Sequence, residues 1–297
     1  MDFKQIENSI KISESKSISA ASEGLFITQS ALNQQLIHLE NELGVKLFQR
    51  SKSGVYLTEA GTAYIKYAKE LLALKKEMMN VLSDYSNYKT GTIKIGLPVI
   101  HGGEMFTHIF PLFHEKYPHI HLMPIELSYS QRFHMINSGE LDLAFVTLAE
   151  SDQTDDEYFP ILNEEIYLAA PADNPLTSVL EGHEEVDLSW LKEEQFVLIN
   201  QGTSLRKYTD ILFRKAGICP NIILETSSYH TITTIVSCGK TFSITPQIIE
   251  NEKGDIKYLH IKGRPYRTFC ALHKKKAYMS QPLKDFLELS INYWKNK

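Results

Sequence analysis

The stretch "ITQSALNQQLIHLE", residues 27–40, sets the fold of the N-terminal part of this chain. Its apolar residues recur at spacings of three and four, which places them on one side of a helix: Ala31, Leu32, Leu36 and Leu39. The other side carries amides, hydroxyls and an imidazole: Gln29, Ser30, Asn33, Gln34 and His38. Solvated helix faces are usually built from Lys and Glu. A face with hardly any charge therefore needs an explanation other than solvation.

The residues around this helix predict a helix-turn-helix. Thr28 stands where an N-cap is expected, directly before the polar-faced helix. The segment before it, "SISAASEGL" (residues 17–25), predicts a short helix capped by Ser17 or Ser19, with Gly24 near its end. Residues 3–12 predict a first amphipathic helix. Two short helices joined by a tight turn are the defining feature of the helix-turn-helix.

A hairpin is predicted next. In "ELGVKLFQRSKSGVYLT" (residues 42–58), "SKSG" indicates a tight tip between strand-like "LFQR" and "VYLT". A hairpin that follows a helix-turn-helix is a wing.

The polar helix face and the wing predict contact with DNA. Asn and Gln can each pair bidentately with adenine in the major groove, and Ser and Thr contact bases or phosphates. Cations in the wing are placed to touch phosphates. The candidate DNA-binding residues are Thr28, Gln29, Ser30, Asn33, Gln34, Arg50 and Lys52, with Lys46 just before the wing. The alternative is a polar surface helix without a ligand.

A long helix is predicted from Thr58 to about Tyr88, a segment without proline and with Gly61 only in its first turn. Apolar residues repeat there at alternating spacings of four and three: Ala60, Tyr64, Tyr67, Leu71, Leu74, Met78, Val81 and Tyr85. This heptad pattern favours a coiled-coil-like dimer helix. The candidate dimerisation residues are Tyr64, Tyr67, Leu71, Leu74, Met78 and Val81. Packing of the helix on its own domain is the alternative.

After Gly91 the chain changes character. Strand-like runs alternate with helical ones down to the last helix over "QPLKDFLELSINYW" (residues 281–294), which predicts an α/β fold with mostly parallel strands. About 200 residues of this organisation predict two sheets rather than one.

Charge and composition are those of an ordinary globular protein. The net charge is −5, and residues 1–90 carry +1 while the remainder carries −6, so the DNA-binding part is only relatively basic. The sequence has neither a run of about 18 apolar residues nor a standard secretory signal, which predicts a cytoplasmic protein without a membrane partner. The three cysteines, Cys219, Cys238 and Cys270, lack CxxC spacing and are expected to be reduced and mostly buried, with a redox sensor as the alternative.

Signals for catalysis or metal binding are weak. "SLRK" (residues 204–207) has the S-x-x-K spacing of serine acylases, but the S-D-N and K-T-G partner motifs are absent. His119 and His121 would share a strand face without a carboxylate or thiol at ligand spacing. Phosphate-binding glycine motifs are also missing. We therefore expect no enzyme activity, no cofactor and no metal.

Residues 17–61, "SISAASEGLFITQSALNQQLIHLENELGVKLFQRSKSGVYLTEAG", strongly resemble the winged helix-turn-helix of LysR-type transcriptional regulators. Looser matches follow along the chain: "GTIKIG" (91–96), "FPLFHEKYP" (110–118), "SGELDLAF" (138–145), "AGICPNIILE" (216–225) and Thr245-Pro246. The resemblance spans essentially the whole chain.

The resemblance implies three parts. Residues 1–61 would form the winged helix-turn-helix, residues 58–90 a linker helix that dimerises, and residues 91–297 an effector-binding domain like a periplasmic binding protein. That domain would have two α/β subdomains, about 91–163 with 268–297, and about 164–267.

The resemblance also implies partners. They are double-stranded DNA at an interrupted, AT-rich inverted repeat, a small-molecule effector, a homodimer or homotetramer, and RNA polymerase. The chain departs from the family where Ser30, Asn33 and Gln34 replace the usual Pro, Ser and Arg or Lys, which removes a groove-facing cation and favours adenine readout. Thr241 replaces a usual glycine two positions after Gly239, so that turn is expected to differ.

The effector site is predicted from strand ends, because open α/β sheets bind ligands beyond the carboxyl ends of their strands, often at helix N-termini. The candidates are Leu97, Pro98, Val99, Ser128, Tyr129, Thr147, Asn200, Gln201, Thr203 and Ser204. Capping is the alternative role for Ser128, Thr203 and Ser204. The set contains no certain cation, so a polar or anionic effector would depend on helix N-termini and hydroxyls. The prediction is a DNA-binding regulator; the alternative is a cytosolic solute-binding module without DNA activity.

Overall fold

The computed structural model describes residues 1–51, 54–85, 90–98, 101–149, 154–247 and 254–296. It divides into two compact units. The first comprises Met1–Thr90 with two short segments, Asn137–Glu140 and Ala277–Ser280, and the second comprises Gly91–Ile136, Leu141–Lys276 and Gln281–Lys297. Each unit is described by itself.

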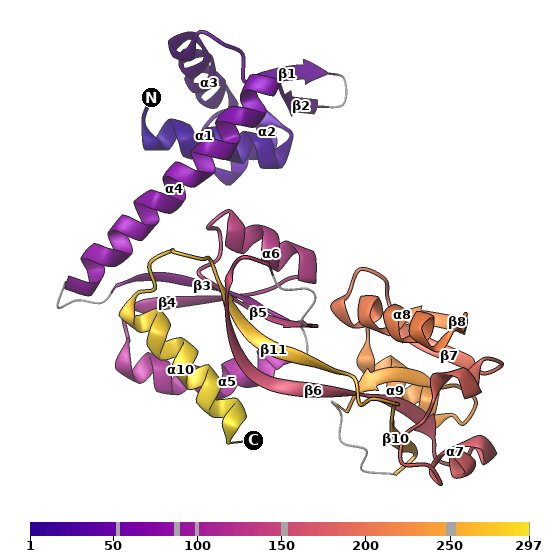
Figure 1. Ribbon diagram of the computed structural model, residues 1–297. Helices are drawn as coiled ribbons and strands as arrows, with labels where there is room; N and C mark the ends of the chain where they lie inside the picture. The colour runs from indigo at the N-terminus through magenta and orange to yellow at the C-terminus, as the bar shows by residue number, and fades with distance from the viewer. Residues whose placement is uncertain (52–53, 86–89, 99–100, 150–153, 248–253, 297) are drawn as a thin grey trace. The chain divides into compact units, whose positions relative to one another are not determined.

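The first unit begins with three helices, α1 (Phe3–Ser15), α2 (Ile18–Gly24) and α3 (Gln29–Leu43) (Figure 1). Ser17 caps α2 and Thr28 caps α3, where the backbone N–H of Ala31 donates to Thr28 Oγ1 at 3.2 Å. Gly44 ends α3 with a φ of 69°, a conformation that side chains with a Cβ rarely adopt. The helices enclose one apolar core, which includes Ile12, Ala21, Leu32, Leu36 and Leu39. The apolar spacing of three and four thus becomes the buried face of α3.

The predicted wing forms as an antiparallel pair, β1 (Phe48–Ser51) and β2 (Gly54–Leu57). A buried carboxylate, Glu40, ties it to α3: one oxygen accepts from the backbone N–H groups of Leu47 (2.8 Å) and Phe48 (3.1 Å). The other accepts from Lys46 Nζ at 2.7 Å. Glu40 is 5% exposed, so the start of the wing is fixed relative to α3.

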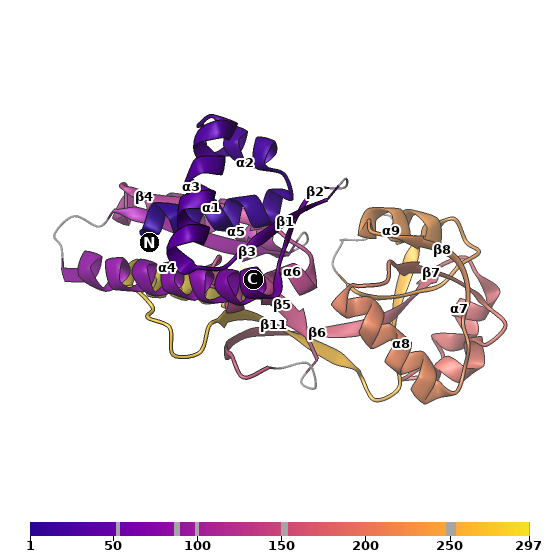
Figure 2. The same ribbon diagram turned by 90° about the horizontal axis from the view of Figure 1, so that it is seen from above.

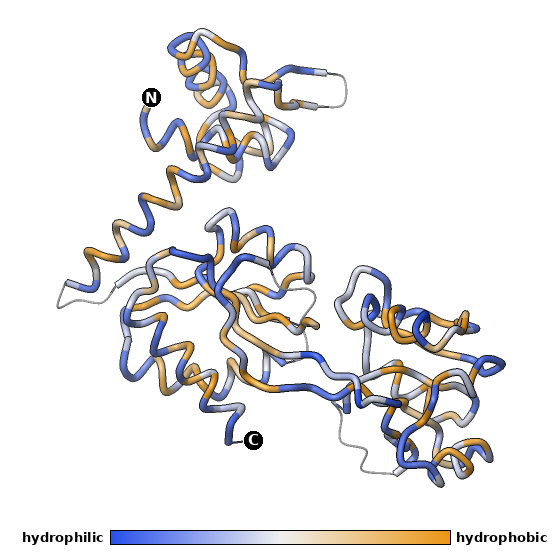
Figure 3. The backbone as a smooth tube through the Cα atoms, viewed as in Figure 1, coloured by the Kyte–Doolittle hydropathy of each residue, from blue (hydrophilic) through white to orange (hydrophobic). Residues whose placement is uncertain are grey.

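Helix α4 (Glu59–Tyr85) follows the wing as the longest helix of the described chain (Figure 1). Gly61 is required at its start, because a Cβ there would lie 1.9 Å from the carbonyl oxygen of Leu47. Ile65 is part of the apolar core of the first unit, and Ala68 is also buried. Apolar and polar segments alternate along α4 in Figure 3.

The second unit is built on a seven-stranded sheet in the order β10-β6-β11-β5-β3-β4, with β9 also pairing β6, and on a two-stranded sheet, β7-β8. The strands are β3 (Gly91–Leu97), β4 (Ile120–Glu126), β5 (Leu143–Leu148), β6 (Glu157–Pro171), β7 (Gln195–Ile199), β8 (Asn221–Thr226), β9 (Ser243–Pro246), β10 (Ile256–His260) and β11 (Tyr266–His273). The helices are α5 (His101–Lys116), α6 (Tyr129–Asn137), α7 (Pro175–Leu180), α8 (Ser204–Ala216), α9 (Tyr229–Ser237) and α10 (Gln281–Lys295), with a 3₁₀ turn η2 (Leu188–Leu191).

Two halves of this unit share the long strand β6, which runs from one half into the other in Figures 1 and 2. Its first part pairs with β11 and its last part with β9 and β10. One half has a core that includes Ile136, Val146 and Leu272, and the other has a core that includes Leu198, Phe213 and Val236. Each half is thus an α/β layer with its own core.

Two expectations are corrected. The strands are not mostly parallel: β3 is parallel to β4 and β5, and β7 to β8, but β11 and β6 make antiparallel pairs because they cross between the halves in opposite directions. The expectation of two sheets agrees with the seven-stranded sheet and the two-stranded sheet β7-β8, although β6 of the larger sheet runs through both halves. The cysteines are not mostly buried: Cys219 and Cys238 are exposed and Cys270 is buried, and all three are free thiols.

Candidate nucleic-acid interface and ligand cavity

The polar face of α3 is open to solvent. Thr28, Gln29, Ser30 and Gln34 are exposed, and Asn33 is half-buried. Leu32, Leu36 and Leu39 are buried on the opposite side, so packing turns the amides outward. Gln29 is oriented by a hydrogen bond of 2.8 Å from Ser19 Oγ to its Oε1, which leaves the amide nitrogen facing away from that contact.

The wing reaches this face through Arg50. Arg50 Nη2 donates a hydrogen bond to Asn33 Oδ1, so that a wing cation and an α3 amide form one pair. Lys46 is engaged with Glu40, which reduces its availability to phosphate. Lys52 lies outside the described residues.

The heptad positions of α4 divide into two groups. Tyr64 is partly buried and packs against the core of the first unit. Farther along the helix, Tyr67 is 61% and Leu74 62% exposed, Leu71 and Met78 are also exposed, and Val81 is half-buried. A row of large apolar side chains on the outside of a helix is a candidate contact surface.

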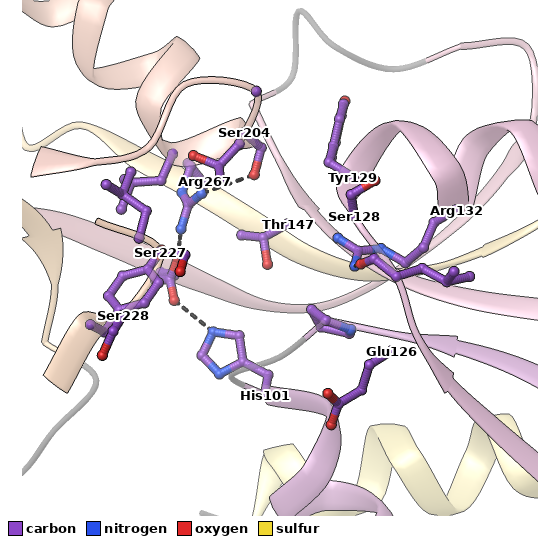
Figure 4. Close-up of a pocket in the computed structure, with 18 residues that line it drawn as sticks. His101, Glu126, Ser128, Tyr129, Arg132, Thr147, Ser204, Ser227, Ser228 and Arg267 are labelled. Atoms are coloured by element: carbon purple, nitrogen blue, oxygen red, sulfur yellow. Dashed lines mark hydrogen bonds and ion pairs between the residues drawn. The ribbon is translucent and has the colours of Figure 1, made fainter. Parts of the chain in front are cut away.

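A cavity of about 710 Å³ lies between the two halves of the second unit (Figure 4). Its lining comprises Pro98, His101, Glu126, Leu127, Ser128, Tyr129, Arg132, Thr147, Glu164, Ile199, Gly202, Thr203, Ser204, Leu205, Ser227, Ser228, Tyr229 and Arg267. The start of four helices, α5, α6, α8 and α9, contributes to this lining. Helix N-termini carry partial positive charge, so the backbone makes the cavity favourable for anions.

The structure brings six of the predicted effector residues to this cavity: Pro98, Ser128, Tyr129, Thr147, Thr203 and Ser204. Leu97 is buried, and Asn200 and Gln201 are exposed; none of these three is among the lining residues. Val99 lies outside the described residues.

Capping explains part of the set. Thr203 caps α8, and the backbone N–H of Gln131 donates to Ser128 Oγ at 3.4 Å. Ser204 is the first residue of α8 and not its cap, and its Oγ accepts a hydrogen bond from Arg267 Nη1 at 3.1 Å. Lys207, the lysine of the S-x-x-K spacing, is exposed.

A buried ionic chain crosses the cavity floor (Figure 4). Glu164 on β6 accepts from His101 Nε2 at 2.7 Å with one oxygen and from Arg267 Nη2 with the other. Burial by itself raises the pKa of Glu164, but the His101 hydrogen bond and the Arg267 charge outweigh it, so the pKa lies below its usual value. Arg267 is 4% exposed and its charge is compensated by Glu164. Tyr229 is packed beside this pair, and burial raises its pKa to about 12.

A second guanidinium lines the cavity at Arg132 on α6. Its Nη1 donates to the backbone carbonyls of Leu97 (3.3 Å) and Leu127. Burial lowers the pKa of Arg132 to about 10. The expectation of a site without a certain cation is therefore wrong, because tertiary packing brings two arginines to it.

The sequence reasoning missed Arg132 and Arg267 for different reasons. Arg132 lies one helical turn after Ser128, so a search of the first turn of each helix that follows a strand end would have found it. Arg267 is the second residue of β11, far from the other site residues in sequence, and only the pairing of β11 with β6 places it beside Glu164. No local pattern marks it.

Other chemistries find no support in the described part of the chain. Within those residues no group of three or more His, Cys, Asp or Glu side chains could hold a metal ion. The three cysteines all lie outside the cavity lining, and burial raises the pKa of Cys270 to about 12. Among the helices described, none is long and apolar enough to cross a membrane.

Two family models match the chain. Residues 3–62 match the bacterial regulatory helix-turn-helix protein of the lysR family, and residues 86–295 match the LysR substrate binding domain. The chain belongs to the LysR family. It is therefore a DNA-binding transcriptional regulator with an effector-binding domain, in a family of regulators rather than enzymes.

Similar proteins cover the whole length. The HTH-type transcriptional regulator YcgK of Bacillus subtilis (strain 168) is 28% identical over 98% of this chain and 94% of its own. The structure of a full-length OxyR variant from Pseudomonas aeruginosa has a TM-score of 0.70 at 23% identity, covering 99% of this chain and 95% of its own. Full-length CbnR complexed with its target DNA has a TM-score of 0.60 at 20% identity, covering 99% and 100%. These likenesses to solved structures show the same fold.

Proposed function

We propose that this LysR-family regulator reads an AT-rich inverted repeat through α3 and the wing and is controlled by a polar or anionic small molecule bound in the cavity of its second unit. The observation that carries the DNA part is the exposed amide face of the capped helix α3, with Arg50 joined to it. Such amides pair with adenine in the major groove, and the wing arginine adds phosphate contact.

The half-sites of an inverted repeat require two copies of the chain in a symmetric arrangement. The exposed apolar row of α4 supplies a surface for that contact: Tyr67, Leu71, Leu74 and Met78. We infer a homodimer held by α4, able to form a homotetramer, which acts in the cytoplasm on transcription by RNA polymerase.

Effector control rests on the cavity and on the strands that join its two halves. Glu164 lies on β6 and Arg267 on β11, so the ionic chain sits where the halves are connected. A molecule that contacts both walls would favour a closed arrangement of the halves, and dimers would transmit this change to the DNA.

Footprinting on the DNA beside the chain's own gene, at two salt concentrations, tests the proposal. We expect a protected inverted repeat whose protection weakens with salt, because phosphate contacts release counterions. A solute-binding module without DNA activity would leave the DNA unprotected even at low salt. The Gln29→Ala variant serves as the matched comparison, since it removes one amide from α3 without altering any charge.

A further inference from the structure

Arg132 is a buried cation whose hydrogen bonds do not use its full capacity. It is 6% exposed, and its Nη1 donates to two backbone carbonyls, those of Leu97 and Leu127. Its Nε is buried and has no hydrogen-bond partner among the described residues. A guanidinium carries five N–H donors, so this side chain retains donors for another group.

The charge of Arg132 is also uncompensated within the described residues. The pKa of Arg132 is lowered by burial and raised by Tyr129, and no carboxylate contributes to the shift. Arg267, the other guanidinium of the cavity, is paired with Glu164. A buried charge without a partner is costly, so the two arginines differ in what they need. Arg132 lacks the anion that Arg267 already has.

The surroundings of Arg132 fit one kind of anion. Figure 4 shows its guanidinium beside Ser128, with Thr147 between this wall and the wall that carries Arg267 and Ser204. The hydroxyls of Ser128 and Thr147 can donate to a carboxylate. The remaining wall includes apolar and aromatic side chains: Pro98, Leu127, Ile199, Leu205, Tyr129 and Tyr229.

The buried carboxylate of the cavity is occupied. Glu164 uses one oxygen for His101 and the other for Arg267. Glu126, the other acid in the lining, is exposed. A ligand ammonium group would therefore face the positive charges of Arg132 and Arg267. No free buried carboxylate would offset this repulsion.

We propose that Arg132 anchors the carboxylate of a small monocarboxylic acid that has an apolar body and lacks an α-amino group. The proposal rests on the effector role of the cavity and specifies the chemistry it selects. The carboxylate would bind the free donors of Arg132 with support from Ser128 and Thr147, and the apolar body would extend toward Leu205 and Tyr229.

Thermal shift and isothermal titration of the full-length protein test the proposal with defined probes. They are hexanoate and 3-phenylpropanoate, their neutral carboxamides, phenylalanine, and inorganic phosphate, all compared with chloride at equal ionic strength. We expect a carboxylate to raise the melting temperature, since a ligand that binds only the folded state stabilises it. The carboxamides and phenylalanine should bind at least tenfold more weakly. If neither carboxylate binds, or if phosphate or a carboxamide binds equally well, the proposal is wrong.

Variants assign the effect to one side chain. Arg132→Met should weaken carboxylate binding at least tenfold and leave the weak carboxamide binding unchanged, whereas Arg132→Lys should retain part of the affinity. Arg214→Met makes the same chemical change at an exposed position outside the cavity and should leave binding as in the original chain. Equal carboxylate affinity in Arg132→Met and the original chain would show that Arg132 is only structural. The carboxylate-to-carboxamide comparison needs no variant, so it stands even if Arg132→Met does not fold.

The same preparations separate this inference from the proposed function. DNA protection is measured without any carboxylate, on the original chain and on Arg214→Met, whose substitution lies outside the cavity and should leave DNA protection unchanged. Loss of DNA protection in every preparation would refute the DNA proposal while leaving the carboxylate result intact. DNA protection together with absent carboxylate binding would refute only the anchor at Arg132.

Discussion

Arg50 of the wing donates a hydrogen bond to Asn33 of helix α3, which links the residue that we propose contacts phosphate to one that we propose reads a base. The sequence alone treats these residues as independent, one reading a base and the other touching the backbone. Their contact means that the amide of Asn33 is oriented by Arg50, with its oxygen occupied and its nitrogen available to donate.

The first prediction is that Arg50→Ala and Asn33→Ala are not additive in DNA binding. Each variant should weaken binding to the footprinted site, and Asn33→Ala should cost about 1 kcal/mol less when Arg50 is already absent, because residues in contact are coupled. Fluorescence anisotropy with specific and scrambled duplexes measures the DNA affinity of the original chain, the two single variants and the double variant. Arg50→Lys is the control that keeps the charge, and full additivity would show that the pair has no role in recognition.

The second prediction concerns the exposed apolar row of α4. Leu71→Gln combined with Leu74→Gln should convert the oligomer to monomers, because the substitutions remove apolar surface from a heptad contact while preserving helix propensity. Sedimentation velocity measures the change. Glu70→Gln, at an exposed position of the same helix, should leave the sedimentation coefficient unaltered. An unchanged coefficient in the double variant would rule out α4 as the dimer contact.

The third prediction follows from the buried carboxylate of Glu40. Glu40→Ala leaves the N–H groups of Leu47 and Phe48 unpaired and should destabilise the wing by about 2–4 kcal/mol, measured by hydrogen exchange of these two amides. Glu23→Ala, an exposed carboxylate on α2, is the control. Normal protection of both amides in Glu40→Ala would contradict the role of this side chain.

Glu40 also gives the wing a pH dependence. Burial raises its pKa, but the hydrogen bonds from Lys46, Phe48 and Leu47 outweigh burial, so the folded pKa lies below 4.5. A carboxyl with a lowered folded pKa contributes stability above the unfolded value and loses it as the pH falls through the folded value. Protection of the two amides should therefore be constant at neutral pH and decline only below about pH 4.5. In Glu40→Ala this acid transition should be absent.

The fourth prediction concerns the ionic chain of the cavity. Glu164→Gln leaves Arg267 buried without its counter-charge and should lower the free energy of unfolding by about 3–5 kcal/mol, as measured by urea denaturation. Adding Arg267→Met should recover most of that loss, since the buried charge is then gone. Glu165→Gln on the same strand removes a carboxylate that pairs with the half-exposed His260, and it should have a much smaller effect. An equal loss of unfolding free energy in Glu164→Gln and Glu165→Gln would contradict the special role of Glu164.

The sequence by itself determined the elements and the family of this protein. The spacing of Leu32, Leu36 and Leu39 and the caps Ser17 and Thr28 define the helices of the DNA-binding unit, because helix periodicity and capping are local. The motif-rich stretch from Ser17 to Gly61 identified the LysR family for the same reason. The strand ends of the second unit likewise placed Ser128, Thr147 and Ser204 at the cavity.

Only the tertiary structure decided the charge of the cavity. Arg267 meets Glu164 across 103 residues of sequence, through the pairing of β11 with β6. Strand pairing at such separations leaves no periodic trace in the sequence, since it depends on register between distant segments. The contact between Arg50 and Asn33 has the same origin, because it requires the wing to fold back on α3. Local patterns therefore identify which residues face outward, and long-range packing decides which of them act together.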